Sequence, residues 1–282
     1  MKACRRAGEA LLRRYPAERR AWTKGDRHNV VTEADLASES VVIEALEAAF
    51  PDHSILSEER GLAMRDARDF WVIDPLDGTS NFVAGIPWFG VLLAHVRDGE
   101  ADLSVVYLPC SDELYTAERG RGARRNGSAI AVSTASSLGE VLWAYGMDDL
   151  GSDELAREKL AVLRAVLRST RNVRTTHSLV DPAYTADGRL GGMLNWSCRI
   201  WDVAAPSLLV REAGGLYTDM EGRPLHLDLS ESAAAREYAV MAGAAQLHPR
   251  MRDLLARARQ ESSRAGPGPI TSASTGPRDS GR

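Results

Sequence analysis

Residues 71–82 read WVIDPLDGTSNF, and this stretch carries two aspartates at the end of an apolar run. The run Trp71–Ile73 predicts a buried strand that ends at Asp74 and brings this carboxylate out of the core. Asp77 follows three residues later, across a turn that the intervening proline and the following glycine favour. Two carboxylates this close repel each other unless a cation neutralises them. Taken alone, the stretch is equally typical of an ordinary Asp-Gly turn at a strand end.

The residues after Asp77 are expected to begin a helix. Gly78, Thr79 and Ser80 would then present free backbone N–H groups at the positive end of the helix dipole, which suits an anion such as phosphate. The turn is also expected to direct the carbonyl oxygen of Leu76 toward a cation, and hard cations such as Mg²⁺ prefer carboxylate and carbonyl oxygens. One short segment could therefore hold a metal ion on one side and a phosphate group on the other.

Three further acidic residues lie far from this stretch, and each has an ordinary structural interpretation. Glu58 follows the expected strand Ser54–Ser57, where a solvated acidic loop is common. Asp35 stands three residues after Thr32, which is a variant of the capping-box spacing. Asp202 precedes an apolar helical segment, where aspartate is a favoured N-cap residue. Taken singly, none of the three indicates a metal site.

The composition permits a packed core and argues against several classes of protein. Hydrophobic residues make up 44% of the 282 residues, which suffices for one large unit or two fused lobes. A formal net charge of −4 argues against binding nucleic acid through bulk charge. No apolar run approaches the ~20 residues of a membrane span, and the N-terminus lacks the apolar core of an export signal. Three widely spaced cysteines show no disulfide framework or zinc spacing, so a cytoplasmic location is expected.

Hydrophobic periodicity divides the chain into a first part rich in strands and a second part that mixes helices with strands. A helix is expected at residues 34–49, with Leu36, Ile43, Leu46 and Phe50 near one face. Strands are expected at 54–57, 71–73, 89–96, 103–108, 113–117, 129–132, 141–145 and 216–218. Further helices are expected at 153–167, 181–187 and 203–213. This order predicts a mixed α/β (α+β) fold in which helices cover layered sheets.

Together, these segments resemble the inositol monophosphatase family. Four pieces match it in chain order: VTEAD (31–35), LSEE (56–59), DPLDGTSNF (74–82) and WDVAA (201–205), the last running into EAGG (212–215). The DPLDGT piece followed far downstream by WDVA is highly specific, and the resemblance extends to about residue 258. It implies a layered αβαβα sandwich of the inositol monophosphatase and fructose bisphosphatase type.

The resemblance also implies how the chain is organised. Residues 1–258 would form one phosphatase unit, with an N-terminal α+β half at about 1–138 and a C-terminal α/β half at about 139–258 that share a single site. Residues 259–282 follow this unit and become rich in Ser, Gly and Pro. Such a composition predicts a disordered tail.

For activity, the resemblance implies a Mg²⁺-dependent phosphomonoesterase with two to three ions in one site. Glu58, Asp74 and the carbonyl of Leu76 would bind a first ion, Asp74, Asp77 and Asp202 a second, and a third, weaker ion is expected near Glu58. Metal binding lowers the pKa of water and so supplies a nucleophile near neutral pH. In-line attack by water without a phosphoenzyme is expected, because the family resemblance implies it and no obvious protein nucleophile is present.

The remaining site residues follow from the same resemblance. Asp35 and Thr79 would orient and deprotonate the attacking water. The amides of Gly78 and Thr79, next to that of Ser80, would hold the phosphate group. Lys24 matches a lysine that the family carries in a loop near the site.

The segment that would contact the substrate departs from the family pattern. The family usually has a Gly-Ser-Ala-like stretch where this chain has Thr176–Val180, and Asn195 stands where inositol-specific members place a glutamate. Inositol monophosphate is the expected substrate, while histidinol phosphate and other sugar or nucleotide phosphates stay open. His177 is interpreted as a packing or turn residue, Trp88 as a core residue and Trp196 as a residue that could line a pocket.

A second class of function is a binding module. Some bacterial members of the family act as partners of the transcription machinery, and arginines near the N-terminus could form a contact surface. These are Arg5, Arg6, Arg13, Arg14, Arg19 and Arg20. A solvated basic face on a first helix is their preferred interpretation. The retained metal ligands favour catalysis on a small phosphorylated metabolite, and a homodimer is expected by analogy with the family.

Overall fold

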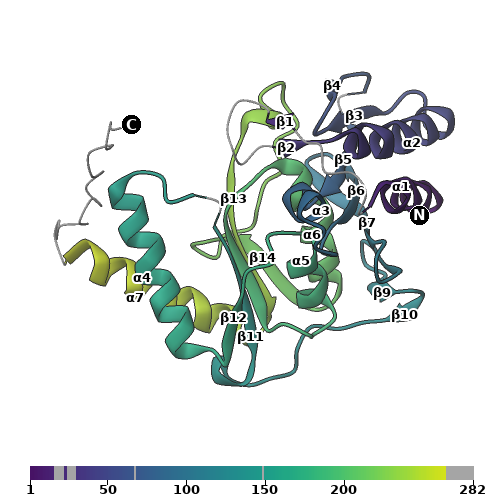
Figure 1. The fold of residues 1–282 in the computed structure, drawn as a ribbon. Helices are drawn as coiled ribbons and strands as arrows, with labels where there is room; N and C mark the ends of the chain where they lie inside the picture. Colours follow the sequence, from purple (N-terminus) through teal and green to yellow (C-terminus); the bar gives the residue numbers. More distant parts are fainter. Residues whose placement is uncertain (16–21, 24–29, 67, 148, 265–282) are drawn as a thin grey trace, which may run out of the picture.

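The computed structural model describes residues 1–15, 22–23, 30–66, 68–147 and 149–264. Their helices and strands stack in five alternating layers, in the order helix, sheet, helix, sheet, helix (Figure 1). This stacking confirms the expected mixed α/β sandwich. Lys24 and the residues after 264 lie outside the described part of the chain.

An eight-stranded sheet forms the first β layer. In spatial order its strands are β10 (Ser128–Ala129), β9 (Ala123–Arg125), β8 (Glu113–Glu118), β7 (Glu100–Leu108), β6 (Gly90–Arg97), β5 (Asp69–Asp77), β3 (Ser54–Ser57) and β4 (Gly61–Ala63). Neighbouring strands are antiparallel except β3 and β5, which run parallel. Both ends of β5 matter below, because each carries a group of titratable side chains.

Helices α1 (Lys2–Arg14) and α2 (Glu33–Ala49) form the outer layer on this sheet (Figure 1). Ile43 and Leu46 of α2 face the core between the helices and the sheet, as predicted. Leu36 and Phe50 are more exposed, at 45% and 39%, although the Phe50 ring packs against Trp71 of the sheet. Both lie at the ends of the helix, in its first turn and just after its last.

The middle layer contains α6 (Ile200–Glu212) and α5 (Val180–Ala186), and short α3 (Thr79–Ala84) follows β5 directly. Side chains of α5 and α6 join both sheets into one hydrophobic core. Most of α6 is buried, because a helix enclosed between two sheets needs apolar residues all round. The start of α6 therefore has a fixed position relative to the end of β5.

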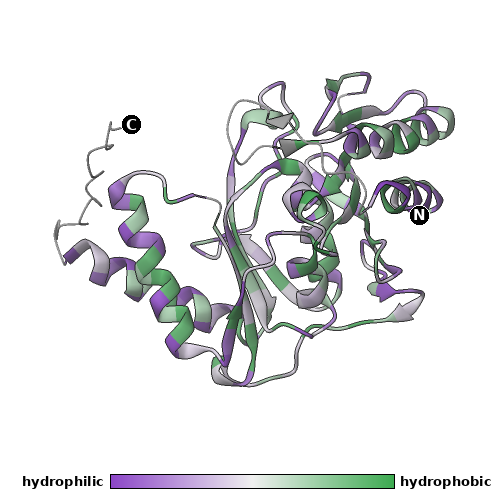
Figure 2. Ribbon diagram, in the orientation of Figure 1, coloured by the Kyte–Doolittle hydropathy of each residue, from purple (hydrophilic) through white to green (hydrophobic). Residues whose placement is uncertain are grey.

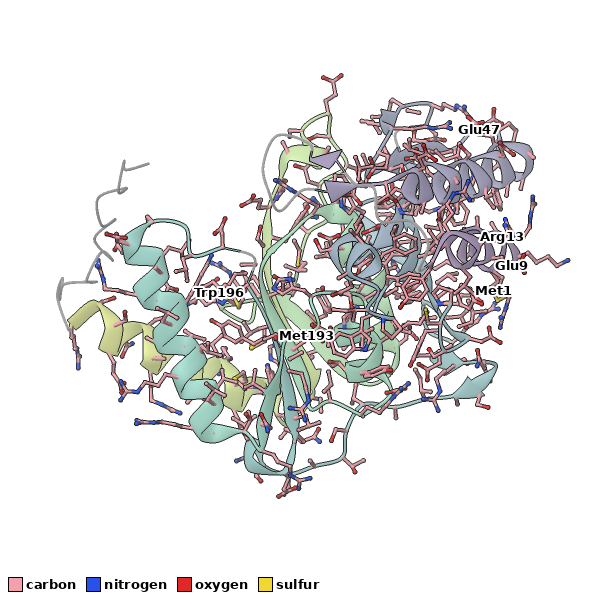
Figure 3. The ribbon with its side chains drawn as sticks, viewed as in Figure 1. Met1, Glu9, Arg13, Glu47, Met193 and Trp196 are labelled. Carbon is pink, nitrogen blue, oxygen red and sulfur yellow. The ribbon has the colours of Figure 1, made fainter. Side chains whose placement is uncertain are left out.

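A five-stranded sheet forms the second β layer. Its spatial order is β12 (Asn172–Arg174), β11 (Leu142–Gly146), β13 (Gly192–Cys198), β15 (Tyr238–Ala244) and β14 (Gly215–Asp219). Helices α4 (Asp153–Ser169) and α7 (His248–Arg264) cover its outer side, and both alternate between hydrophilic and hydrophobic residues (Figure 2). Trp196 points toward this helical layer (Figure 3), with the Arg259 guanidinium 5.3 Å from its ring centroid.

Four small elements complete the described fold. Strands β1 (Trp22–Thr23) and β2 (Val30–Val31) pair antiparallel just before α2. Two 3₁₀ turns, η1 (Leu138–Glu140) and η2 (Ala233–Ala235), lie in connecting segments. None of the described helices has both the length and the apolar character that crossing a membrane requires.

Several elements differ from the sequence-based expectation. Strands β13 and β15 and helix α7 were not anticipated. For α7 the reason is that it buries only a sparse stripe of four residues. This helix continues to Arg264, so residues 259–264 are helical and not part of an irregular tail. Strand β10 ends at Ala129, which leaves 130–132 outside the expected strand. All three cysteines are free, as expected from their spacing.

Candidate active site

A bulge in β5 turns Asp74 and Asp77 toward the same side. In a regular strand, residues three apart point to opposite faces. Here Asp74 pairs with Leu92 but Asp77 pairs with Gly90, so β5 takes three steps where β6 takes two. One extra residue of this kind defines a β-bulge and restores the shared side. The predicted strand end at Asp74 was wrong, since β5 continues through Asp77 and the bulge does what a turn was expected to do.

Helix α2 holds this bulge from outside. The buried Ser38 hydroxyl donates a 2.6 Å hydrogen bond to the carbonyl of Pro75. The backbone N–H of Leu76 donates to Asp74 Oδ1 at 3.0 Å, so the carboxylate is fixed by its own strand. The Leu179 N–H donates to Asp77 Oδ1 at 2.6 Å from the start of α5. Both aspartates are therefore oriented before any ligand arrives.

Asp202 completes a group of three carboxylates. Carboxylate oxygens of Asp74, Asp77 and Asp202 all lie within 4.8 Å of one another, although the residues are up to 128 positions apart. Asp202 lies in the first turn of α6, where it accepts a 2.6 Å hydrogen bond from the Arg199 N–H. It was predicted as an N-cap residue, but Arg199 occupies the N-cap and Asp202 stands three positions later.

The electrostatics of this group favour a bound cation. Burial raises the pKa of Asp74 well above its usual value, and the neighbouring charges of Glu58, Asp77 and Asp202 raise it further. Burial also raises the pKa of Asp77, to about 7. A divalent cation would relieve both effects, and a donor set made only of oxygens suits Mg²⁺ better than softer ions. The residues present therefore fit a magnesium site.

Gly78 joins the bulge to α3 in a conformation that few other residues adopt. Its φ of 83° lies in the left-handed region, and an added Cβ would stand 2.5 Å from the Trp88 carbonyl oxygen. Thr79 then opens α3, and its hydroxyl lies 2.9 Å from the Leu76 carbonyl and 3.2 Å from Asp35 Oδ1. The expected helix start at residues 78–80 is confirmed, although α3 has only six residues.

Asp35 approaches the site from α2. The capping box predicted from Thr32 and Asp35 is present, because Asp35 Oδ2 accepts from the Thr32 N–H at 2.8 Å and from its hydroxyl at 2.7 Å. Burial raises the pKa of Asp35 to about 6, despite these two hydrogen bonds. Its side chain has no exposed surface, so it can reach the cavity only through the Thr79 hydroxyl.

These groups line one cavity of about 450 Å³ between the two sheets. Of the residues expected at the site, the cavity brings together Glu58, Asp74, Leu76, Asp77, Gly78, Thr79, Ser80, Asn195 and Asp202. Asp35 lies behind Thr79, and Lys24 is outside the described residues. The lining is mostly polar and acidic at one end, which suits a small polar molecule that carries an anionic group.

The segment of residues 176–180 and Asn195, which depart from the family pattern, also contribute to the lining of the cavity. Asn195 of β13 lies against Gly146, whose missing Cβ leaves room for the amide. His177 has a φ of 52° and its Nε2 accepts a 2.7 Å hydrogen bond from the Met147 N–H, which is typical of a turn residue, although the ring also faces the cavity. Trp196 packs toward α7 and not into the cavity.

The sequence-based assignments of Trp88 and Trp196 were both wrong. Trp88 was expected in the core but is 42% exposed. The tryptophan that does line the cavity is Trp201, which stands beside Asp202 at the start of α6. Trp201 is the first residue of the WDVAA segment, but local sequence does not reveal which side of the helix start faces the cavity.

Asp181 is a site residue that sequence reasoning missed. It lies in the first turn of α5, is only 5% exposed and lines the cavity. The Thr176 hydroxyl donates a 2.7 Å hydrogen bond to its carboxyl, and burial raises its pKa to about 7. An aspartate at the start of a short helix is too common to signal a site, so only the packing of α5 reveals it.

The layered fold and the gathered carboxylates define a class of proteins that hold divalent cations at the end of a β-strand. The chain belongs to the inositol monophosphatase family, whose model matches residues 1–264. This match confirms the resemblance seen in the four sequence pieces. The family consists of Mg²⁺-dependent phosphatases.

Individual relatives carry two different names. The Nus factor SuhB of Salmonella typhimurium is 35% identical over 261 residues, covering 91% of this chain and 97% of its own. An inositol-1-monophosphatase of Mesorhizobium japonicum is 39% identical over 209 residues, covering 73% and 78%. The solved structure of an IMPase from Thermotoga maritima superposes with a TM-score of 0.81 at 29% identity, covering 93% and 96%.

Proposed function

We propose that this protein hydrolyses a small polar phosphate monoester, with inositol monophosphate as the preferred substrate. The observation that carries the proposal is the convergence of Asp74, Asp77 and Asp202 within 4.8 Å at one end of a 450 Å³ cavity. Glu58 and the Leu76 carbonyl lie in the same lining. The family membership and the Mesorhizobium relative support the same activity.

The metal ligands are proposed from the family resemblance, and their place in one cavity lining supports the assignment. Glu58, Asp74 and the Leu76 carbonyl would hold one Mg²⁺ ion, Asp74, Asp77 and Asp202 a second, and a third, weaker ion would lie near Glu58. Bound Mg²⁺ would supply positive charge to the phosphoryl group and lower the pKa of a neighbouring water. The raised pKa values of Asp74 and Asp77 indicate how strongly these carboxylates need such charge.

The Asp35–Thr79 pair would activate the attacking water. When the Thr79 hydroxyl donates to Asp35 Oδ1, its oxygen turns a lone pair toward the cavity and can accept a hydrogen bond from water. Asp35 would take the proton through this hydroxyl, because its own side chain is fully buried. A pKa of about 6 leaves Asp35 largely ionised, and so able to act as a base, at neutral pH.

The substrate would lie between α3 and β13. Backbone amides of Gly78, Thr79 and Ser80 would bind the phosphate group, and Lys24 would add a positive charge beside it. Asn195 would contact the hydroxyl-bearing part with both a donor and an acceptor. A neutral amide does not select strongly among hydroxyl-bearing groups, so the substrate needs a direct test. The test is to measure kcat/KM for inositol 1-phosphate, histidinol phosphate, fructose 1,6-bisphosphate and adenosine 3′,5′-bisphosphate. Inositol 1-phosphate should rank first, and a higher value for another ester would reassign the substrate.

Replacing Asp77 by asparagine tests the catalytic proposal directly. Asp77→Asn keeps the side-chain shape and an acceptor for the Leu179 N–H, but it removes one of the three converging charges. The steady-state rate with Mg²⁺ should fall by about 10²-fold or more. The matched control is Asp253→Asn on the exposed side of α7, which should keep the wild-type rate. An unchanged rate in Asp77→Asn would show that this site is not the catalytic site.

The route of phosphoryl transfer has its own test. Direct attack by water should place one ¹⁸O atom in inorganic phosphate when hydrolysis runs in ¹⁸O water. Rapid quenching should then trap no phosphorylated side chain. Recovery of a phosphoenzyme would overturn the water route while leaving the metal ligands in place.

A second candidate function is binding to the transcription machinery, which the name Nus factor of the Salmonella relative favours. The contact surface would be the basic side of α1, where Arg6 and Arg13 are exposed. Arg6→Glu with Arg13→Glu should weaken binding to purified RNA polymerase and leave phosphatase activity intact, whereas Asp77→Asn should do the reverse. Equal binding by the wild type and the arginine variant would argue against this surface.

The remaining expectations are proposals of organisation. Two halves, at about 1–138 and 139–258, would share the site, with Asp74 and Asp77 contributed by the first half and Asp202 by the second. A cytoplasmic homodimer is proposed by analogy with the family. Light scattering coupled to size exclusion would report the mass in solution, and a monomer mass would exclude the dimer.

A further inference from the structure

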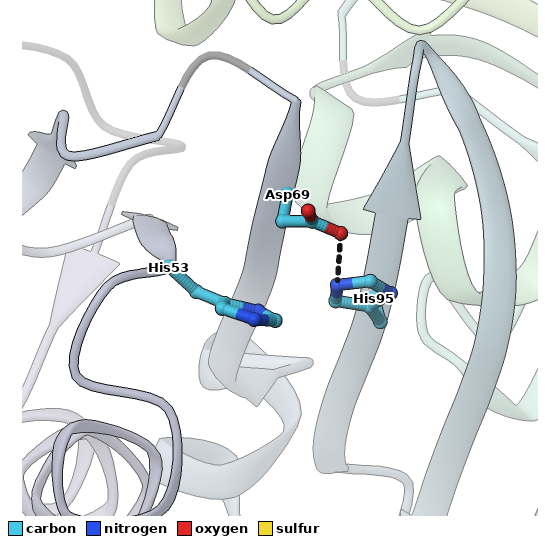
Figure 4. A group of neighbouring side chains, drawn as sticks. All are labelled: His53, Asp69 and His95. Atoms are coloured by element: carbon cyan, nitrogen blue, oxygen red, sulfur yellow. Dashed lines mark ion pairs between the residues drawn. The ribbon is translucent and has the colours of Figure 1, made fainter.

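A second group of titratable side chains lies at the opposite end of β5 from the acidic cavity. It consists of His53, just before β3, Asp69, at the start of β5, and His95 on β6 (Figure 4). One ligand atom of each residue lies within 4.8 Å of the others. His95 pairs with Trp71, and Trp71 follows Asp69 by two residues on β5. The group shares no residue with the lining of the candidate active site.

Hydrogen bonding prepares His95 to offer a lone pair. Its Nδ1 lies 2.6 Å from Asp102 Oδ1, a distance at which the imidazole N–H donates a hydrogen bond to the carboxylate. In the neutral ring Nε2 then carries the lone pair. Nε2 is buried and has no hydrogen-bond partner among the described residues, and the side chain of His95 is only 8% exposed. Asp69 Oδ1 lies 3.4 Å from this Nε2 atom (Figure 4).

His53 offers a second buried lone pair or donor. Its Nδ1 is likewise buried without a hydrogen-bond partner among the described residues. The His53 and His95 rings are 5.3 Å apart between centroids, and Phe50 and Trp71 pack around them. Leaving two polar nitrogens in such an aromatic surrounding costs free energy unless something binds them. An acceptor nitrogen that faces a carboxylate is stabilised when a proton or a metal ion lies between the two.

We propose that His53, Asp69 and His95 form a site for a borderline transition-metal ion of the Zn²⁺ type. Zn²⁺ binds imidazole nitrogen at about 2.0–2.1 Å and carboxylate oxygen at about 2.0–2.2 Å, so neighbouring ligands of a tetrahedral site are roughly 3.3–3.5 Å apart. The Nε2-to-Oδ1 distance of 3.4 Å matches such an edge. Two imidazoles in the donor set select Zn²⁺-like ions over Mg²⁺.

Asp102 and Arg97 would support the ligands. Asp102 fixes the tautomer and orientation of His95, as carboxylates commonly do for metal-binding histidines. Arg97 Nε donates a 2.7 Å hydrogen bond to Asp69 Oδ1, and this contact fixes the orientation of the carboxylate. The two carboxylates and one guanidinium sum to a charge of −1, so the group attracts a cation.

The neighbouring charges are already paired with one another. Arg68 forms an ion pair with Asp98, and Arg119 forms one with Glu100. They therefore add little net charge at the three ligands. A bound ion would tie the segment after α2 to β5 and β6. Because the other end of α2 carries Asp35, the ion would stabilise the layer that supports the active site, without entering the reaction.

Metal content is the direct test. Wild-type protein in saturating Mg²⁺ is incubated with Zn²⁺, passed over a desalting column and assayed by inductively coupled plasma mass spectrometry. The wild type should retain one equivalent more than His53→Gln or His95→Gln. Asp102→Ala should weaken Zn²⁺ binding in calorimetry by about 10- to 100-fold. The exposed His226→Gln is the matched histidine control and should retain the wild-type content.

Two further measurements keep the test independent of folding and of catalysis. Co²⁺ bound to the wild type in excess Mg²⁺ should give the intense visible bands of a four-coordinate nitrogen-containing site, which needs no variant. The Asp77→Asn protein should lose turnover yet keep the extra Zn²⁺ equivalent. Equal Zn²⁺ content in the wild type and both histidine variants, or a purely octahedral Co²⁺ spectrum, would overturn the proposal.

Discussion

At the scale of a single residue, Gly78 shows how the backbone shapes the site. Two demands meet there: a φ of 83° and a close approach to the Trp88 carbonyl. Positive φ alone disfavours side chains, but the second demand leaves no space for a Cβ at all. The glycine thus lets β5 pass into α3 while Asp74 and Asp77, the proposed metal ligands, stay close to the helix start.

Gly78→Ala should therefore destabilise the protein and displace α3. We expect the free energy of unfolding, measured with urea, to fall by about 1–3 kcal/mol. Gly120→Ala is the control, because Gly120 has a φ of 74° but no atom within 4 Å of an added Cβ. A larger loss at Gly78 than at Gly120 isolates the clash with Trp88. Equal losses would mean that backbone strain alone matters.

At the scale of elements, two helices deliver aspartates to the site in the same way. Asp35 of α2 and Asp202 of α6 both stand three positions after the N-cap, and both accept a hydrogen bond from the N-cap N–H. The positive end of each helix dipole also favours a carboxylate at this position. A local helix-start motif is thereby used to orient a functional group.

Thr32→Ala should separate the structural from the functional use of such a motif. Loss of an N-cap side chain costs about 1 kcal/mol, and here it also removes the 2.7 Å hydrogen bond that orients Asp35. Stability and kcat should both fall. Ser152→Ala removes the comparable N-cap of α4 at a residue that does not line the cavity, and should lower stability by a similar amount with kcat unchanged. Equal kcat in the two variants would mean that the capping box does not contribute to catalysis.

At the scale of the whole molecule, the site concentrates carboxyl groups that prefer to be protonated when no metal is present. Burial raises the pKa of Asp35 to about 6 and those of Asp77 and Asp181 to about 7, from about 3.9 in the unfolded chain. Between these limits the folded protein binds more protons than the unfolded chain. The contribution of these three groups to stability therefore falls as pH rises from about 4 to about 7.

Thermal melts with and without metal would detect this linkage. In EDTA, the cluster's contribution should lower Tm as the pH rises through that window. Mg²⁺ at about 100 times its Kd adds about 2.7 kcal/mol, so Tm at pH 7 should rise by several degrees. The gain should be smaller near pH 4, where protons compete with the ion. Asp77→Asn should flatten the EDTA profile, and a Mg²⁺ effect independent of pH would contradict the linkage.

Much of the site could be predicted because its signals are local. The DPLDGT and WDVAA segments and the Thr32–Asp35 spacing each lie within a few residues, where chain geometry alone limits the outcome. Asp74 and Asp77 lie at the end of an apolar strand in the structure, and Asp35 closes the capping box that its spacing indicated. The expected strand Ser54–Ser57 has the observed limits for the same reason.

Tertiary structure decided what the sequence left open. The bulge that turns Asp77 toward Asp74 depends on the pairing with β6, and the place of Asp181 depends on how α5 packs between the sheets. The group of His53, Asp69 and His95 has no recognisable spacing and forms only because three strands align side by side. Short-range hydrogen bonds are encoded by neighbouring residues, whereas distances between remote side chains are fixed only when the layers pack.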